Sequence, residues 1–161
     1  MVTSIQDYMH GNKPNHIYIG IDPGKSGAMA IILDTGKIYV ERFDEGIRSL
    51  FDLLLLTTKY DHTCMLEKVH SFPGLGVRST FNFGVNYGIW LSLLKSTNIN
   101  YDLLPPKQWM QHYIKLGTLT KQERKNKFKS IAQSLYPNIK VTLINADAIL
   151  IAHYCKITSN S

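Results

Sequence analysis

Short apolar segments alternate along the chain with polar turns and with stretches whose apolar residues recur at helical spacing. Three such segments come early, at residues 16–22, 26–33 and 37–43. The turns between them contain Pro-Gly and Asp-Thr-Gly, which are strong turn formers. Short apolar runs joined by tight turns are typical of strands that pair antiparallel with their neighbours. This part of the chain is therefore predicted to form a three-stranded meander.

Helices and single strands alternate in the rest of the pattern. The expected elements are a helix at residues 45–60, a strand at 63–67, a helix at 80–96, a strand at 99–104, and helices at 107–116, 120–136 and 145–157. Thr120 is followed three residues later by Glu123, the signature of a capping box at a helix start. A meander followed by strand–helix units predicts an α/β fold, with a five-stranded mixed sheet and helices on both faces.

The length of 161 residues suits one domain. We expect a flexible polar lead-in at residues 1–15, one folded domain at 16–158 and a tail at 159–161. No apolar run has signal-peptide character or the length to span a bilayer, so an intracellular protein is expected. Cys64 and Cys155 are far apart in apolar runs, and we interpret them as small buried residues.

The charge of the chain is concentrated in one segment. Residues 105–130 contain seven basic residues and one acidic residue, which equals the net charge of +6 of the whole chain. A one-signed segment of this kind indicates a polyanionic partner such as nucleic acid. The alternative is a solvated helix face, which is the usual fate of a run of charges.

Three acidic residues stand where apolar segments end or begin. Asp22 ends the first strand, Glu67 ends the fourth, and Asp147 lies near the start of the last helix. Each has a structural alternative: a turn former for Asp22, a solvated strand end for Glu67, and a helix-dipole partner for Asp147. Three carboxylates that converged would repel one another unless a cation lay between them. Oxygen ligands suit Mg²⁺ or Mn²⁺, and paired ions of this type cleave phosphodiesters.

Several segments together resemble the RuvC-type Holliday-junction resolvases, including phage and prophage members. GIDPG at residues 20–24 looks like the family's opening strand motif. LEKV at 66–69 and ADAILIA at 146–152 are similar to its second and third acidic motifs. The stretch 73–90 and PKQW at 106–109 resemble segments of the phage members.

The resemblance implies an RNase H-like fold, a homodimer, and a crossover junction endodeoxyribonuclease that makes paired symmetric nicks in four-way DNA junctions. It implies Asp22, Glu67 and Asp147 as ligands of two Mg²⁺ ions per active site, with Mn²⁺ as a substitute, and Lys125 as a catalytic residue. No small-molecule cofactor and no membrane partner are expected. The implied location is the cytoplasm of a bacterial or phage-infected cell, with an organelle as the alternative.

DNA contacts are expected from the basic segment and from the region after Glu67. The candidates are Lys107, Lys121, Arg124, Lys125, Lys127, Lys129, His70, Phe72 and Arg78. Such basic residues position DNA without reading its sequence. An aromatic residue such as Phe72 can stack on junction bases, or it can instead anchor its loop in the core.

One feature departs from the family pattern. The fourth acidic ligand that resolvases place shortly before the last Asp is absent here, where Thr142, Leu143 and Ile144 stand. Asn145 carries an amide oxygen, but its helical phase does not suit a simple replacement. This departure keeps two alternatives open: a non-catalytic or weakly active junction-binding protein, and another RNase H-like nuclease that acts on branched DNA or RNA–DNA hybrids.

Overall fold

The computed structural model describes residues 5, 9, 13–24, 26–69, 76–117 and 119–159. The predicted meander comprises β1 (His16–Asp22), β2 (Ala28–Leu33) and β3 (Ile38–Arg42). After a short 3₁₀ turn (Phe43–Glu45) follow α2 (Ile47–Thr57), β4 (Asp61–Glu67), α3 (Val77–Ser96), β5 (Asp102–Leu104), α4 (Pro106–Tyr113), α5 (Lys121–Leu135) and α6 (Ala146–Ser159).

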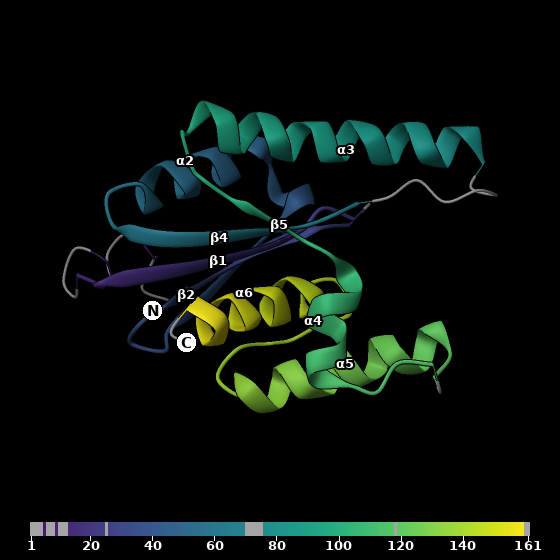
Figure 1. The fold of residues 1–161 in the computed structure, drawn as a ribbon. Helices are drawn as coiled ribbons and strands as arrows, with labels where there is room; N and C mark the ends of the chain where they lie inside the picture. The colour runs from purple at the N-terminus through teal and green to yellow at the C-terminus, as the bar shows by residue number, and fades with distance from the viewer. Residues whose placement is uncertain are drawn as a thin grey trace.

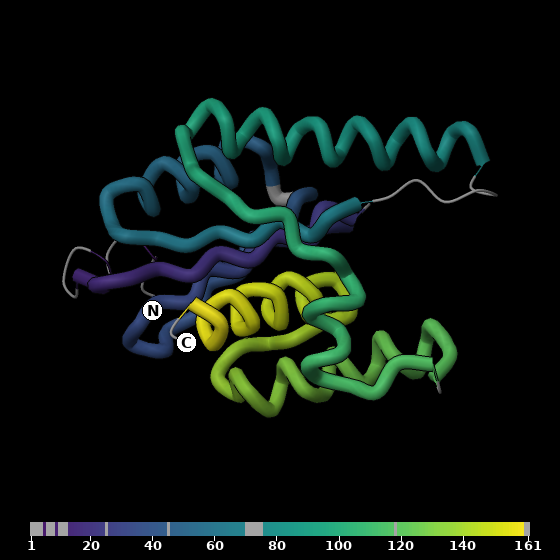
Figure 2. Tube along the Cα trace, viewed as in Figure 1, coloured from purple at the N-terminus to yellow at the C-terminus, as the bar shows by residue number. Residues whose placement is uncertain are grey.

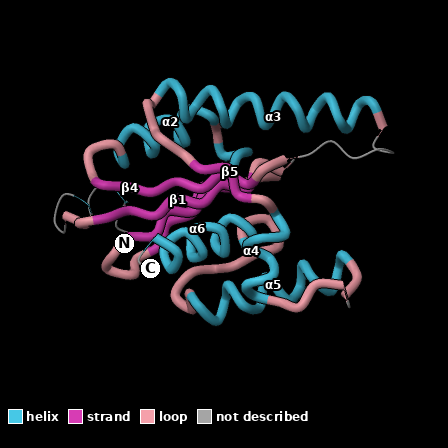
Figure 3. Tube along the Cα trace, in the orientation of Figure 1, coloured by secondary structure: helices cyan, strands magenta, loops and turns pink. Residues whose placement is uncertain are grey.

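The strands form one five-stranded sheet in the order β3-β2-β1-β4-β5. The meander pairs are antiparallel, whereas β4 pairs parallel with both β1 and β5. Figures 1 and 3 show α2 and α3 on one face of the sheet and α4, α5 and α6 on the other. The expected mixed sheet with helices on both faces is thus confirmed.

The alternation of side chains along β1 divides the interior into two apolar clusters. Ile17, Ile19 and Ile21 pack with residues of α2 and α3, whereas Tyr18 packs with residues of α5 and α6. Neighbouring residues of a strand point to opposite faces of a sheet. A central strand covered on both faces is apolar at nearly every position, which explains the short continuous apolar runs in the sequence.

Helix α6 lies directly against β1 at Gly20. A Cβ atom at residue 20 would clash with the backbone nitrogen of Ala152 and lie 2.7 Å from the carbonyl oxygen of Ala148. Only glycine permits this close approach of two backbones. Figure 2 shows α6 crossing beneath the sheet, with its first turn toward the ends of β1 and β4.

Several expected boundaries differ from the structure. Helix α3 begins at Val77, three residues before the expected start. Strand β5 begins at Asp102 and not at residue 99, because the chain first turns through Asn98, which has a positive φ of 57°. Ile5 and Met9 lie in the core, so contact with it begins within the expected lead-in.

Other local expectations are confirmed. Thr120 and Glu123 form the capping box at the start of α5. Cys64 and Cys155 are buried free thiols.

Within the ranges described above, no helix combines the length and the apolar character that crossing a membrane requires.

We expect Gly20→Ala to destabilise the protein, because the added methyl group must push α6 away from β1. Overpacking of this kind costs about 1–3 kcal/mol, which lowers Tm by about 2–12 °C in a domain of this size. Thermal unfolding measures the effect. The matched control is Gly84→Ala in α3, where the methyl group meets open space and the helix gains about 0.5–1 kcal/mol. Equal Tm values for the two variants would contradict the close contact.

Candidate functional site

Two of the predicted acidic residues lie side by side at one end of the sheet. Ile21 of β1 pairs with Leu66 of β4 in parallel register, so the next residues along, Asp22 and Glu67, are neighbours. Asp22 shares its face of β1 with Gly20, because every second residue points the same way. Glu67 shares its face of β4 with Met65, which packs on the α6 side. Both carboxylates therefore belong to the face that α6 covers.

The third acidic residue comes from the first turn of α6. Asp147 is buried, with 7% of its surface exposed. Its Oδ2 atom forms an ion pair with Nζ of Lys125 at 2.8 Å. The exposed N–H groups of a helix start favour a carboxylate in this position. The structure thus brings one basic residue of the 105–130 segment to the acidic residues.

Lys125 reaches this position because of its phase on α5. Phe128 and Ala132, which follow it by three and seven residues, are buried in the cluster that includes α6. Residues at these spacings share one face of a helix. Lys125 consequently points toward α6, and only 36% of its side chain is exposed.

Each carboxylate of the site has a different partner. The backbone N–H of Gly24 donates to Oδ1 of Asp22 at 3.0 Å. The indole N–H of Trp109 donates to Oε1 of Glu67 at 2.9 Å. Oδ1 of Asp147 is buried and has no hydrogen-bond partner among the described residues. A buried carboxylate oxygen without a partner is costly, so this atom points to a missing ligand.

The backbone of the turn after Asp22 is held by a hydrogen bond and by close packing. The N–H of Gly27 donates to the carbonyl oxygen of Gly24 at 2.9 Å. A Cβ atom at Gly27 would clash with the carbonyl oxygen of Asp22. The turn therefore needs glycine at position 27 to hold the end of β1 in place.

The charges of the site perturb one another. Burial raises the pKa of Glu67 to about 8, and repulsion by Asp22 adds to this effect. Burial likewise raises the pKa of Asp22 to about 6, with a contribution from Asp147. Burial lowers the pKa of Lys125, but attraction by Asp147, Asp22 and Glu67 outweighs it and leaves a raised pKa. All four groups are therefore close enough to interact strongly.

A hollow of about 320 Å³ opens beside these groups. Its lining comprises Asp22, Gly24, Ser26, Lys125, Leu143 and Ile144. Leu143 and Ile144 stand at positions where the sequence resemblance led us to expect a fourth acidic residue. They form an apolar wall of the hollow instead. Asn145 is engaged elsewhere, since its Oδ1 accepts from the N–H of Thr142 at 2.7 Å.

The donor atoms of the site suit a hard divalent cation. They are carboxylate oxygens, which Mg²⁺ and Mn²⁺ prefer, and one of them is buried without a partner. As the side chains stand, no group of three or more His, Cys, Asp or Glu residues in the described part of the chain is arranged to hold a metal ion. Asp22, Glu67 and Asp147 remain the predicted ligands.

The other predicted DNA-contacting residues lie outside this cluster. Lys107 is exposed in the first turn of α4, and Arg78 is exposed in the first turn of α3. Lys121, Lys127 and Lys129 are exposed on α5, and Arg124 is partly exposed there. His70 and Phe72 lie outside the described residues.

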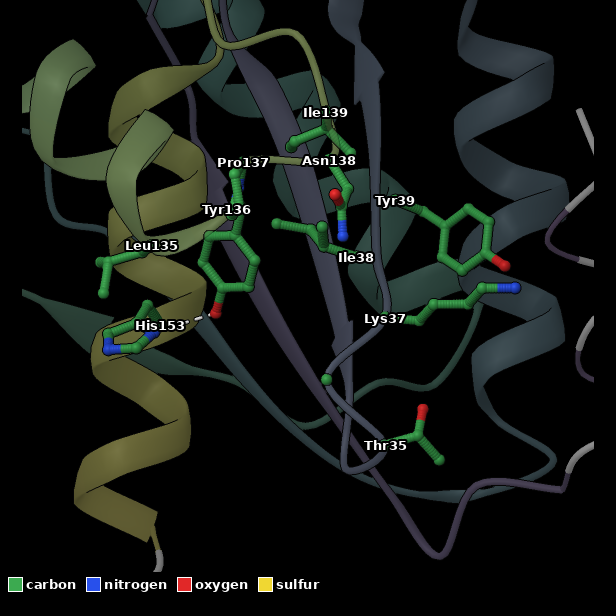
Figure 4. A pocket seen from close by; sticks show the side chains of 11 residues that line it. Thr35, Lys37, Ile38, Tyr39, Leu135, Tyr136, Pro137, Asn138, Ile139 and His153 are labelled. Atoms are coloured by element: carbon green, nitrogen blue, oxygen red, sulfur yellow. Dashed lines mark hydrogen bonds between the residues drawn. The ribbon is translucent and has the colours of Figure 1, made fainter.

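A larger hollow, of about 710 Å³, lies near the turn between β2 and β3. Figure 4 shows Ile38 and Tyr136 on its walls. The hydroxyl oxygen of Tyr136 and Nδ1 of His153 form a hydrogen bond of 2.9 Å. This turn adjoins the first residue of β1, because the N–H of Asp34 donates to the carbonyl oxygen of His16. A seven-residue strand spans roughly 20 Å, so this hollow is remote from Asp22. None of the predicted site residues lines it.

Sequence reasoning missed the contact between Trp109 and Glu67. Trp109 is fully buried and packs on Phe128 of α5, with ring centroids 4.9 Å apart. It therefore connects α4 and α5 to the end of β4. The available signal was the PKQW segment, in which a tryptophan stands among polar helix residues.

The described architecture is an RNase H-like α/β fold of the RuvC type. A solved structure of Thermus thermophilus RuvC is similar to this chain with a TM-score of 0.56 and 15% identity, over 89% of this chain and 96% of that one. T. thermophilus RuvC in complex with a Holliday junction substrate gives a TM-score of 0.57 and 13% identity, over 89% and 95%. No protein-family model and no curated protein matches the chain. At these identities the likeness shows the fold.

We expect Glu67→Gln to stabilise the metal-free protein at alkaline pH. The raised pKa means that wild-type Glu67 lowers stability progressively as pH rises from its ordinary pKa near 4.5 through about 8. Glutamine removes the charge and still accepts the bond from Trp109, so a gain on the order of 1–3 kcal/mol is expected at pH 9 and none at pH 4.

Thermal unfolding at both pH values in EDTA measures this difference. The control is Asp61→Asn at the exposed start of β4, for which no such pH-dependent gain is expected. A Glu67→Gln protein that is less stable than wild type at pH 9 would show that the ionised Glu67 carboxylate does not destabilise the metal-free fold.

Proposed function

We propose that this protein is a metal-dependent endonuclease that cleaves branched DNA, with the four-way junction as its substrate. The observation that carries the proposal is the meeting of Asp22, Glu67 and Asp147 with Lys125 at one end of the sheet. The RuvC-type fold supports it, because a protein of that fold has been seen with a Holliday junction substrate. Paired symmetric nicks, as implied by the sequence resemblance, are part of the proposal.

The chain supplies four groups to the proposed reaction. Asp22, Glu67 and Asp147 hold the divalent cation. When bound, such a cation activates water and offsets the charge that develops on a phosphodiester. Lys125 adds a fixed positive charge beside them, which favours an anionic phosphate and its more highly charged transition state. The product is a nick with a 5′-phosphate and a 3′-hydroxyl.

The exposed basic residues of α4 and α5 bind the DNA backbone in this proposal. Lys107, Lys121 and Lys127 extend from the same side of the sheet as α6 and carry charge without an ion-pair partner in the described part of the chain. Phosphate contacts of this kind fix the position of DNA and weaken with salt. The selectivity for branched DNA then comes from shape.

A second candidate function is a junction-binding protein without nuclease activity. The observation that favours it is the apolar wall of Leu143 and Ile144 beside Asp22, since this wall cannot hold a cation. The two functions differ in one measurable property, which is nicking that depends on Mg²⁺ or Mn²⁺.

The decisive experiment uses Asp22→Asn on a labelled four-way junction. We expect the wild type to nick the junction with Mg²⁺ and the variant to lose at least about 100-fold in rate, because it loses a metal-ligand charge. Binding to the junction in EDTA should stay within about threefold. The matched control is Asp34→Asn in the turn at the other end of β1, which should cleave normally.

Duplex, Y-shaped and RNA–DNA hybrid substrates in the same assay test the choice of substrate. Wild-type binding without nicking would favour the second candidate function. Equal nicking by the wild type and Asp22→Asn would overturn the assignment of Asp22.

We also propose that the protein is a homodimer that associates through α3. The N-terminal half of this helix extends past the sheet (Figure 1). Three of its apolar side chains are exposed. Val77, Phe81 and Val85 are 88%, 70% and 45% exposed. Arg78 and Lys95, near its two ends, are its only charged residues. A neutral apolar stripe suits a second copy of itself better than DNA, and a two-fold dimer matches a two-fold junction.

Phe81→Glu should therefore convert the dimer to a monomer of 18.3 kDa. The large exposure of Phe81 means that the fold tolerates the charge, while an interface between two copies does not. Light scattering after size exclusion measures the mass. Ile47→Glu, on the exposed side of α2, is the control and should leave the dimer intact. A wild type that is already monomeric at high concentration would refute this interface.

A further inference from the structure

The charged side chains at this end of the sheet determine how much positive charge the site can hold. Asp22, Glu67 and Asp147 are all ionised when they act as ligands of a divalent cation. With Lys125 in contact with Asp147, the net formal charge of these four groups is then −2, not counting the cation. One divalent cation balances this charge, whereas two would leave a surplus of +2 in a partly buried site. Buried uncompensated charge is costly.

The carboxylate oxygens that remain available as ligands also favour one cation per site. One oxygen of each carboxylate is engaged by a group of the chain: Asp22 by the N–H of Gly24, Glu67 by Trp109, and Asp147 by Lys125. Each carboxylate keeps a second oxygen without a protein donor among the described residues. Three such oxygens suit one Mg²⁺ ion, which usually retains several waters and takes few protein ligands.

The remaining wall of the hollow offers no further carboxylate for a second ion. Leu143 and Ile144 are apolar and stand beside Asp22 and Lys125. The amide of Asn145 is used at both ends, accepting from Thr142 and donating to the carbonyl oxygen of Lys140. This asparagine stabilises the start of α6 and does not face the cation site as a free ligand.

We propose that the site binds one divalent cation per chain, and that the Lys125 ammonium takes the electrostatic place of a second one. The inference rests on the proposed function and revises its expected metal content from two ions to one. Lys125 is a positioning residue toward the cation, since it occupies an oxygen of Asp147 that a second ion would need.

The arrangement gives Lys125 a defined effect on metal affinity. Its positive charge lies close to the carboxylates that bind the cation, so it repels that cation while it neutralises Asp147. Removal of the ammonium leaves three uncompensated carboxylates and one more free oxygen. The first cation should then bind more tightly, although the metal-free protein loses the ion pair between Lys125 and Asp147.

Titration of the full-length protein with Mn²⁺, followed by electron paramagnetic resonance and by calorimetry, tests the proposal. We expect one Mn²⁺ per wild-type chain. Lys125→Met should bind its first Mn²⁺ at least tenfold more tightly. The matched control is Lys95→Met, which removes one charge from the exposed end of α3 and should change the affinity less than twofold.

A double variant tests the charge argument in the opposite direction. Lys125→Met combined with Ile144→Asp removes the ammonium and adds a fourth carboxylate in the wall of the hollow. We expect this protein to bind two Mn²⁺ ions. If either variant fails to fold, the stoichiometry of the wild type remains a sufficient test, because it needs no substitution.

The outcomes separate this inference from the proposed nuclease. Two Mn²⁺ ions bound to the wild type would overturn the single-ion site and leave the nuclease assignment in place. No bound Mn²⁺ at millimolar concentrations would overturn it as well, and the nicking assay would then judge the nuclease independently. Unchanged or weaker Mn²⁺ binding by a folded Lys125→Met protein would show that Lys125 does not compete with the cation.

Discussion

The direct contact between the backbones of α6 and β1 at Gly20 determines how the candidate site is assembled. Two residues beyond Gly20, β1 ends in Asp22, and one residue before Ala148, α6 carries Asp147. A side chain at position 20 would separate the two elements and move these carboxylates apart. The parallel pairing of β1 with β4 then adds Glu67 on the same face. One close contact and one strand register therefore place three residues that are up to 125 positions apart in the chain.

This assembly works against stability at the site itself. Buried carboxylates that repel one another raise the pKa values of Asp22 and Glu67 and lower the stability of the metal-free fold. The two apolar clusters on either side of the sheet compensate, because β1 and β2 bury side chains on both faces. Lys125 reduces the remaining repulsion. A site that is strained without its ligand and supported by a rigid core is typical of places where proteins bind or react.

Much of this fold follows from local patterns in the sequence. The meander, the helix order and the capping box at Thr120 depend on short-range spacing, and the structure contains them. The strand-end positions of Asp22 and Glu67 were also predictable, because they interrupt apolar runs. Lys125 was singled out only by the resemblance to the resolvases. Local spacing does not distinguish it, because its neighbours in the sequence are equally basic and only its phase relative to Phe128 separates it. The hydrogen bond from Trp109 to Glu67 joins residues 42 positions apart, and its one local signal is a tryptophan among polar helix residues.

In the proposed function, the basic segment has two roles that depend on the packing of α5. The face of α5 that packs through Phe128 and Ala132 holds Lys125 against Asp147, and the opposite face leaves lysines in solvent. Because α5 and α6 share an apolar cluster, the packing of the two helices fixes the inner lysine beside the carboxylate that it contacts. Helix packing thus divides lysines that look alike in the sequence into one that is held against Asp147 and others that are exposed to solvent.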